Sequence, residues 1–198
     1  MVKKIINPFA IYSDRVLLFV GILATVTGFL LAYFLNAIFD GAIDLHFVDK
    51  SNLQSHAGTA LIALLSMVIC LYAAAYFINP KTRLRDIIVV VMIARIPIYA
   101  EILTNINDYQ FLFSEKLLKI LPSSQANPDA LITFLSDNIF WIIANVIISL
   151  GMLIFFFILL FNGFKTATNL KKPLHILLFV AAIILAEIIS KTLIYLFF

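Results

Sequence analysis

The chain has 198 residues, of which 63% are hydrophobic and 13% charged, and its formal net charge is +3. Soluble domains have about 25% charged residues, so this composition excludes an ordinary water-soluble protein. The basic residues lie in short loops rather than on one reachable face, which argues against a nucleic-acid partner. A single cysteine, Cys70, rules out an intrachain disulfide.

Five long apolar segments fill most of the chain. At about 1.5 Å per helical residue, each is long enough to cross or nearly cross a hydrocarbon layer of about 30 Å. We therefore predict an all-α polytopic membrane bundle with five transmembrane helices, forming one domain over residues 1–198. The first segment is longer than a signal-peptide core and no small-residue cleavage site follows it, so we expect it to be retained. The segments are residues 16–36, 57–77, 87–103, 140–161 and 174–197.

The charges in the loops alternate between basic and acidic along the chain. Lysine and arginine in short loops favour the cytoplasmic side, and nine of the 14 basic residues fall in three segments that five crossings would place on one face. This pattern predicts that the N-terminus lies inside and the C-terminus outside. The nine residues are Lys3, Lys4 and Arg15; Lys81, Arg83 and Arg85; and Lys165, Lys171 and Lys172.

Two connecting segments have a helical or interfacial character. We expect residues 1–15, which Pro8 interrupts, to form a short interfacial arm on the inner headgroups. The outer loop over residues 104–136 contains an amphipathic stretch, 111–121, which predicts a helix flat on the outer leaflet or a lid over a central cavity. Asn127-Pro128-Asp129 is a helix-start signal for a second short helix.

Small residues at helical spacing predict which helix faces point inward, because close packing in lipid depends on small side chains. We expect the opposite for the run Phe155-Phe156-Phe157, which should meet mostly lipid. We interpret Cys70 as a packing residue rather than a nucleophile. The small-residue positions are Gly21, Thr25 and Gly28; Ala63, Ser66, Cys70 and Ala74; Asn145, Ser149 and Gly151; and Ala182, Ala186 and Ser190.

Four charged residues lie inside predicted spans: Arg95 and Glu101 in the third, Glu187 and Lys191 in the fifth. A charge at membrane depth costs at least about 2.5–3.5 kcal/mol, so such groups normally face the protein and pair. Glu187 and Lys191 are four residues apart, in the favourable acid-first order. Arg95 and Glu101 lie roughly 13 and 22 Å into their helix, against roughly 21 and 27 Å for Glu187 and Lys191. We predict a polar cluster, structural or transport-related, that joins the two helices.

Pro97 belongs to the same candidate cluster. It cannot donate a backbone hydrogen bond to the carbonyl of Ile93 and can therefore kink the third helix. Arg95 and Glu101 point about 120° apart around an ideal helix, so both cannot face the fifth helix without such a distortion. Transporters often place sites at interrupted helices, but an ion pair that fixes helix pairing is the alternative interpretation.

Other chemistry finds little support in the sequence. His46 lies near Asp40, Asp44 and Asp49, with His56 further on, but the spacing is irregular for a metal site. Motifs for zinc peptidases, serine hydrolases and phosphate-binding loops are absent. We therefore expect no enzyme activity, no catalytic residues, no metal and no cofactor.

Three stretches resemble the Yip (Ypt-interacting protein) family in its bacterial form. They are Ile6-Asn7-Pro8-Phe9, the basic segment 82–97 with its proline inside the span, and the segment from Phe161 onward. The resemblance implies five spans with the N-terminus inside, in a bacterial cytoplasmic (inner) membrane. The Asp-Leu-Tyr-Gly-Pro signature of eukaryotic members is missing, so their contact with small GTPases is not carried over.

Two functions follow as hypotheses. The first is a non-enzymatic Yip-like membrane protein that acts through lipid or through protein partners at its cytoplasmic loops, with homo-oligomerisation left open. The second is a small-solute or ion transporter or channel that uses the buried charges. A dry, paired cluster favours the first hypothesis, and a cavity that reaches one membrane face favours the second.

Overall fold

The structure is a computed structural model that describes residues 2–123 and 128–198. It confirms the all-α class, with five helical segments long and apolar enough to span a membrane. The third segment is divided into two helices that are separated by Arg95. The spanning helices are α2 (Asp14–Phe34), α3 (Leu53–Ile78), α4 (Leu84–Ala94) with α5 (Ile96–Glu101), α8 (Ile139–Thr168) and α9 (Pro173–Phe197). The chain is a multi-pass membrane protein.

Shorter elements fill the connections. The predicted interfacial arm holds α1 (Val2–Ile6) and the 3-10 turn η1 (Pro8–Ala10). The segment after α2 forms two short strands, β1 (Ala37–Phe39) and β2 (Leu45–Phe47), which the sequence analysis does not anticipate. The predicted amphipathic loop contains η2 (Ile102–Asp108), α6 (Tyr109–Ile120), η3 (Leu121–Ser123) and α7 (Pro128–Asp137). Asn127 lies outside the described residues.

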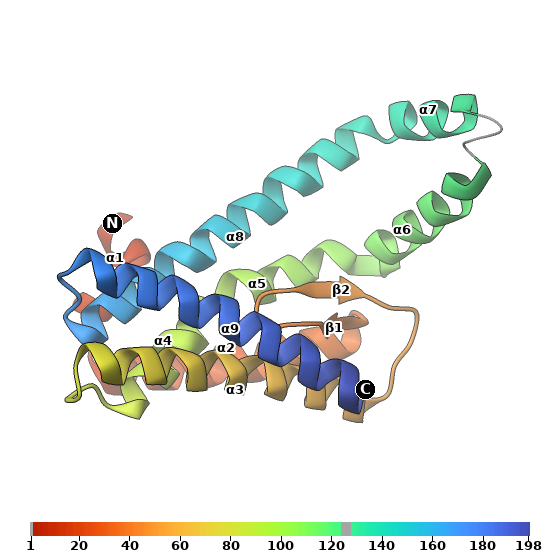
Figure 1. The fold of residues 1–198 in the computed structure, drawn as a ribbon. Coiled ribbons are helices and arrows are strands. Elements are labelled where there is room, and N and C mark those ends of the chain that lie inside the picture. The colour runs from red at the N-terminus through yellow and green to blue at the C-terminus, as the bar shows by residue number, and fades with distance from the viewer. Residues whose placement is uncertain (1, 124–127) are drawn as a thin grey trace.

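The helices form a tight group from which α8 departs at an angle (Figure 1). The α3–α9 pair makes the most extensive contact between elements, and α4 packs between α2 and α8. The α6–α7 pair lies beside the first turns of α8 and away from the hairpin, rather than over it. α1 and the last turn of α9 lie at opposite ends of the bundle, as an odd number of crossings requires.

The centre of the bundle is α4, which is apolar on every side after its first turn. Ile87 and all six residues from Val89 to Ala94 are buried. A helix that is hydrophobic all round is expected to be surrounded by protein or lipid, and α4 is surrounded by α2, α3 and α8. The third span is therefore the most enclosed of the five, and it carries Arg95.

Most of the predicted small-residue faces do point inward. Gly21 and Gly28 of α2 are buried, as are Ala182, Ala186 and Ser190 of α9. At Gly28 the approach is so close that an added Cβ would overlap the ring of Tyr99. Small residues thus allow α2 to lie directly against α5 and α9 to lie against α3.

The packing prediction is wrong for α8. Gly151 is exposed with no neighbouring atom within 4 Å of an added Cβ, so it does not face the protein. Phe156, which was expected to meet lipid, has an exposed fraction of 0%, whereas Phe157 is 37% exposed. The reason is that α8 touches the bundle mainly through its C-terminal half, so a small residue in its N-terminal half has no partner helix.

Gly28→Ala should destabilise the protein, because the new methyl group overlaps the Tyr99 ring. Overpacking of this kind costs about 1–3 kcal/mol, so the midpoint of thermal unfolding in detergent should fall. Gly151→Ala is the matched control, since alanine meets open space there and favours helix over glycine by about 1 kcal/mol. An equal loss of stability in both variants would contradict the close contact between α2 and α5.

Candidate functional site

The unexpected feature of the fold is the β-hairpin between α2 and α3, which folds back against the bundle. Its strands pair antiparallel, with Ala37 opposite Phe47 and Phe39 opposite Leu45. Ala37, Phe39 and Ala42 are at most 1% exposed, so one side of the hairpin and its tip are enclosed by helices. Non-helical backbone at membrane depth is tolerated only where protein or a water-lined cavity surrounds it. The hairpin tip must therefore find hydrogen-bond partners on the helices.

Arg95 supplies one of these partners. Its guanidinium is 1% exposed, and Nη1 donates a 2.7 Å hydrogen bond to the carbonyl oxygen of Ala42 at the tip. The same group lies 4.8 Å from the ring centre of Phe39 and 5.8 Å from that of Tyr99. Aromatic faces attract cations, most strongly where water is excluded. The buried cation is thus held by a carbonyl dipole and two rings.

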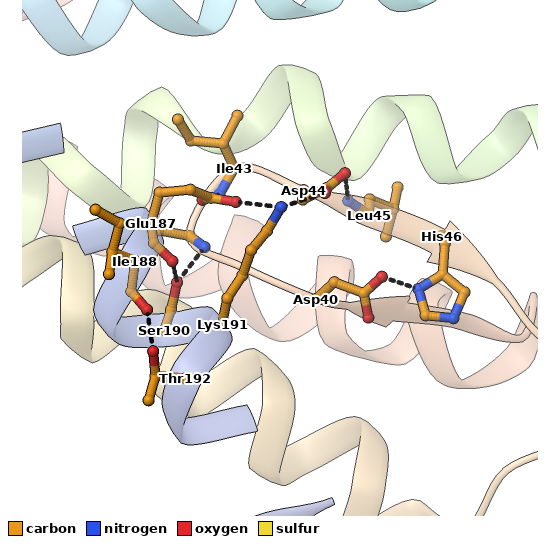
Figure 2. Close-up of polar contacts among 11 residues, drawn as sticks. Asp40, Ile43, Asp44, Leu45, His46, Glu187, Ile188, Ser190, Lys191 and Thr192 are labelled. Atoms are coloured by element: carbon orange, nitrogen blue, oxygen red, sulfur yellow. Dashed lines mark hydrogen bonds and ion pairs between the residues drawn. The ribbon is translucent and has the colours of Figure 1, made fainter. Parts of the chain in front are cut away.

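The fifth span supplies the remaining partners, as Figure 2 shows. Ser190 Oγ accepts a 2.7 Å hydrogen bond from the backbone N–H of Ala42, and Glu187 Oε2 accepts one of 2.9 Å from that of Ile43. Lys191 Nζ lies 2.8 Å from Asp44 Oδ2 and 3.2 Å from Glu187 Oε1. We call Arg95, Glu187, Ser190 and Lys191, with the tip residues 40–44, the hairpin lock.

Glycine at position 41 is part of this fit. An added Cβ at Gly41 would overlap the carboxylate of Glu187. The tip can approach α9 closely enough for Ala42 and Ile43 to reach their side-chain acceptors because no side chain stands between them. The local sequence Asp40-Gly41-Ala42 therefore suits a buried turn.

Three of the four predicted charges, Arg95, Glu187 and Lys191, surround the hairpin tip, but they are neither all buried nor all paired as expected. Arg95 is buried, Glu187 is half-buried and Lys191 is exposed. Glu187 and Lys191 pair as predicted. Arg95 does not pair with Glu187. Its hydrogen-bond partner is the backbone carbonyl of Ala42, and within residues 2–123 and 128–198 no ion pair of Arg95 is found. Lys191 contacts Asp44 rather than Glu101. The third and fifth spans are joined through the hairpin that lies between them.

Pro97 does interrupt the third span. α4 ends at Ala94, and α5 begins at Ile96 with Pro97 in its first turn. Arg95 stands at the break with φ −75° and ψ −7°, and its carbonyl accepts a hydrogen bond from Tyr99. In the first turn of a helix the backbone N–H groups have no acceptor within the helix, so a proline there costs no hydrogen bond. The break therefore allows Arg95 to leave the regular helical course beside the hairpin tip.

Glu101 occupies a different place from the lock. It lies on the wall of a groove of about 530 Å³ between the hairpin, α5, α9 and α8. Asp44 and Glu187 line the same groove, opposite Val146, Ser149 and Leu150 of α8. Among the described residues the carboxylate of Glu101 has no hydrogen-bond or ion-pair partner. The groove thus combines three carboxylates with an apolar wall.

Two of the three histidines, His46 and His56, contact the hairpin. His46 pairs with Asp40 across the hairpin, and the buried His56 of α3 contacts the carbonyl of Ala37 through Nδ1 at 2.9 Å. Over the part of the chain that the structure describes, no group of three or more metal-ligating side chains converges.

The sequence does contain a signal for the hairpin. Asp-Gly between short alternating apolar runs is typical of a β-hairpin, and Asp40-Gly41 lies between Ala37-Ile38-Phe39 and Leu45-His46-Phe47. Asn36, with φ 52°, makes the turn from α2 into β1. Ser190 was assigned to packing alone, although its hydroxyl also binds the tip.

Comparison with family models, with curated proteins and with solved structures finds no match for this chain. The resemblance to the Yip family therefore stays a prediction.

Glu187→Leu should destabilise the protein, because it leaves the partly buried N–H of Ile43 without an acceptor and removes one partner of Lys191. An unsatisfied buried group costs about 1–3 kcal/mol. Glu187→Gln should cost less, since an amide oxygen can still accept from Ile43. Thermal unfolding in detergent would measure both, with Ile188→Leu as an exposed control on the same helix. If leucine and glutamine behave alike at position 187, the hydrogen bond to the tip does not stabilise the fold.

Proposed function

We propose that this chain is a non-enzymatic integral membrane protein of Yip-like type that acts by holding protein partners or lipid. The observation that carries the proposal is that the buried Arg95 and the half-buried Glu187 are both occupied in fixing the hairpin. Arg95 binds the Ala42 carbonyl, and Glu187 binds the Ile43 N–H. Side chains that must stay in place to pair with backbone groups are poorly suited to binding and releasing an ion or a proton in each transport cycle.

The proposed membrane is a bacterial cytoplasmic membrane, with the N-terminus inside. The support for this orientation is the clustering of lysine and arginine at the end of the bundle that carries α1. The loop between α8 and α9 holds Lys171 and Lys172, which are exposed. Together with the arm at Pro8–Ala10 this loop offers a basic contact surface for a cytoplasmic partner.

A partner at this surface can be tested by mild-detergent purification with quantitative mass spectrometry of co-purified proteins. Replacing Lys165, Lys171 and Lys172 by glutamine should remove at least one specific partner, because its acidic contacts lose their counter-charges. The control replaces Lys116 and Lys119, which lie on α6 near the other end of the bundle. An unchanged set of partners in the first variant would count against the proposed contact surface.

The groove lined by Glu101 favours one second candidate, a path for small cations. Its three carboxylates attract positive charge, and Glu101 is not occupied by the lock. The two candidates make opposite predictions for Glu101→Gln, which leaves the hairpin contacts untouched. Under the proposed function, neither the wild-type protein nor Glu101→Gln should give a flux of H⁺, Na⁺ or K⁺ above that of empty vesicles, measured in proteoliposomes loaded with dyes for these cations.

Under the second candidate, the wild-type protein carries at least one of these cations and Glu101→Gln abolishes the flux. The double variant Arg95→Leu with Glu187→Leu supplies the complementary result. It should lose stability if the charges serve the fold. If it folds in normal yield but loses flux or a growth function, the charges are functional and the proposal is wrong.

A further inference from the structure

A second hollow lies at the opposite end of the bundle from the hairpin lock. It has a volume of about 360 Å³ and is enclosed by η1, α2, the α3–α4 loop, α4 and α8. Three basic residues, Lys81, Arg83 and Arg85, converge on it. All three are exposed, and their side chains have no hydrogen-bond or ion-pair partner within the described ranges. We call this hollow the basic cavity.

The loop that carries two of these cations is fixed in place. The side chains of Asn79 and Thr82 both donate hydrogen bonds of 3.4 Å to the end of α8, at the carbonyls of Thr168 and Ala167. Thr82, which stands between Lys81 and Arg83, is buried. The backbone that carries Lys81 and Arg83 is therefore anchored, so only their side chains have to become ordered when an anion binds.

The floor of the basic cavity is apolar. Phe9 of η1 reaches in beside Val90 of α4, and both lie so close to α8 that a Cβ on Gly163 would come within 2.8 Å of each. The position of the arm is reinforced by Asn162, whose amide donates a 3.1 Å hydrogen bond to the carbonyl of Ile6. A charged rim above an apolar floor suits a ligand that has a polar head and an apolar remainder.

An apolar groove continues on the other side of the arm. It has a volume of about 380 Å³ and lies between the arm, α2, α4, α5 and α8. Leu17 borders both the groove and the basic cavity. Of two consecutive residues in the arm, Pro8 borders the groove and Phe9 borders the basic cavity. Ile93 and Phe155 form part of the groove wall. The polar cavity and the apolar groove are therefore neighbours at one membrane interface.

The rim also carries two carboxylates, Asp14 at the start of α2 and Asp86 in the first turn of α4. Three cations and two carboxylates around one hollow match a headgroup that has a phosphate and an ammonium group. Arginine binds phosphate with paired hydrogen bonds. Free phosphate would use the cations alone and leave the carboxylates and the groove without a role.

We propose that the basic cavity binds an aminophospholipid, of which phosphatidylethanolamine is the simplest form, from the leaflet on the side of the N-terminus. The phosphate lies against Arg83 and Arg85, the ammonium group lies toward Asp14 and Asp86, and one acyl chain lies in the apolar groove. The site goes beyond the proposed function, because it names one class of lipid and the residues that bind it. It lies at the opposite end of the bundle from the hairpin lock. It borders the partner surface at the arm Pro8–Ala10, but its cations are Arg83 and Arg85 rather than Lys165, Lys171 and Lys172, so its failure leaves the hairpin lock and those lysines unaffected.

The test is native mass spectrometry of the delipidated full chain, titrated with phosphatidylethanolamine or phosphatidylglycerol of equal chain length. Wild-type protein should bind one phosphatidylethanolamine more tightly than any further lipid. Arg83→Gln with Arg85→Gln should weaken this first binding at least about tenfold, because each charge-assisted hydrogen bond is worth about 1.5–3 kcal/mol. The control variant, Lys171→Gln with Lys172→Gln, removes the same amount of charge at the same end of the bundle but outside the cavity. It should leave the affinity for the first phosphatidylethanolamine unchanged.

Two further measurements test the headgroup contacts and the role of the groove separately. Asp14→Asn with Asp86→Asn should abolish the preference for phosphatidylethanolamine over phosphatidylglycerol. Glycerophosphoethanolamine, which is the headgroup without chains, should fail to displace the lipid at equal concentration. The site would be overturned if the lysine and arginine variants weakened the affinity for phosphatidylethanolamine equally, or if neither weakened it. Displacement of the lipid by the chain-free headgroup would overturn the role of the groove. If the variant Arg83→Gln with Arg85→Gln does not fold, Lys81→Gln with Arg83→Gln takes its place.

Discussion

The architecture depends on pairing the backbone of a turn where water is scarce. The hairpin tip brings carbonyl and N–H groups among helices that have already used their own backbone groups internally. Only side chains can then complete the pairing, and unpaired groups in such surroundings cost several kcal/mol. Arg95, Glu187 and Ser190 meet this requirement from two directions. Because Glu187 and Ser190 are three residues apart, they share one face of α9 and can serve adjacent residues of the tip.

Arg95 illustrates how a buried cation is tolerated without a carboxylate beside it. Removing an ion from water costs several kcal/mol even after relaxation. A charge-assisted hydrogen bond contributes about 1.5–3 kcal/mol, and a desolvated cation over an aromatic ring contributes about 2 kcal/mol. One such bond and two rings offset part of this cost, while Nε of the same guanidinium is buried and has no hydrogen-bond partner among the described residues. The residue therefore determines where the hairpin docks more than it adds to overall stability.

The sequence predicted the features that depend on local pattern. Length and hydropathy located five spans, spacing identified the Glu187–Lys191 pair, and Pro97 marked the interruption beside Arg95. The partner of Arg95 could not be predicted, because it is a backbone carbonyl and any residue carries one. The burial of Phe156 was missed for a related reason: lipid and protein are equally apolar, so hydrophobicity does not say which of them a side chain meets.

The lock also imposes an order on how the protein can be made. The N–H groups of Ala42 and Ile43 find their acceptors 148 and 144 residues further along the chain. A ribosome that has delivered α2, the hairpin and α3 has yet to make α9, so the tip emerges without two of its partners. The newly made hairpin must remain in contact with water, or with the cell's insertion machinery, until the final helix joins α3. The hairpin tip is therefore completed only after α9 has been made, by a serine and a glutamate of that helix.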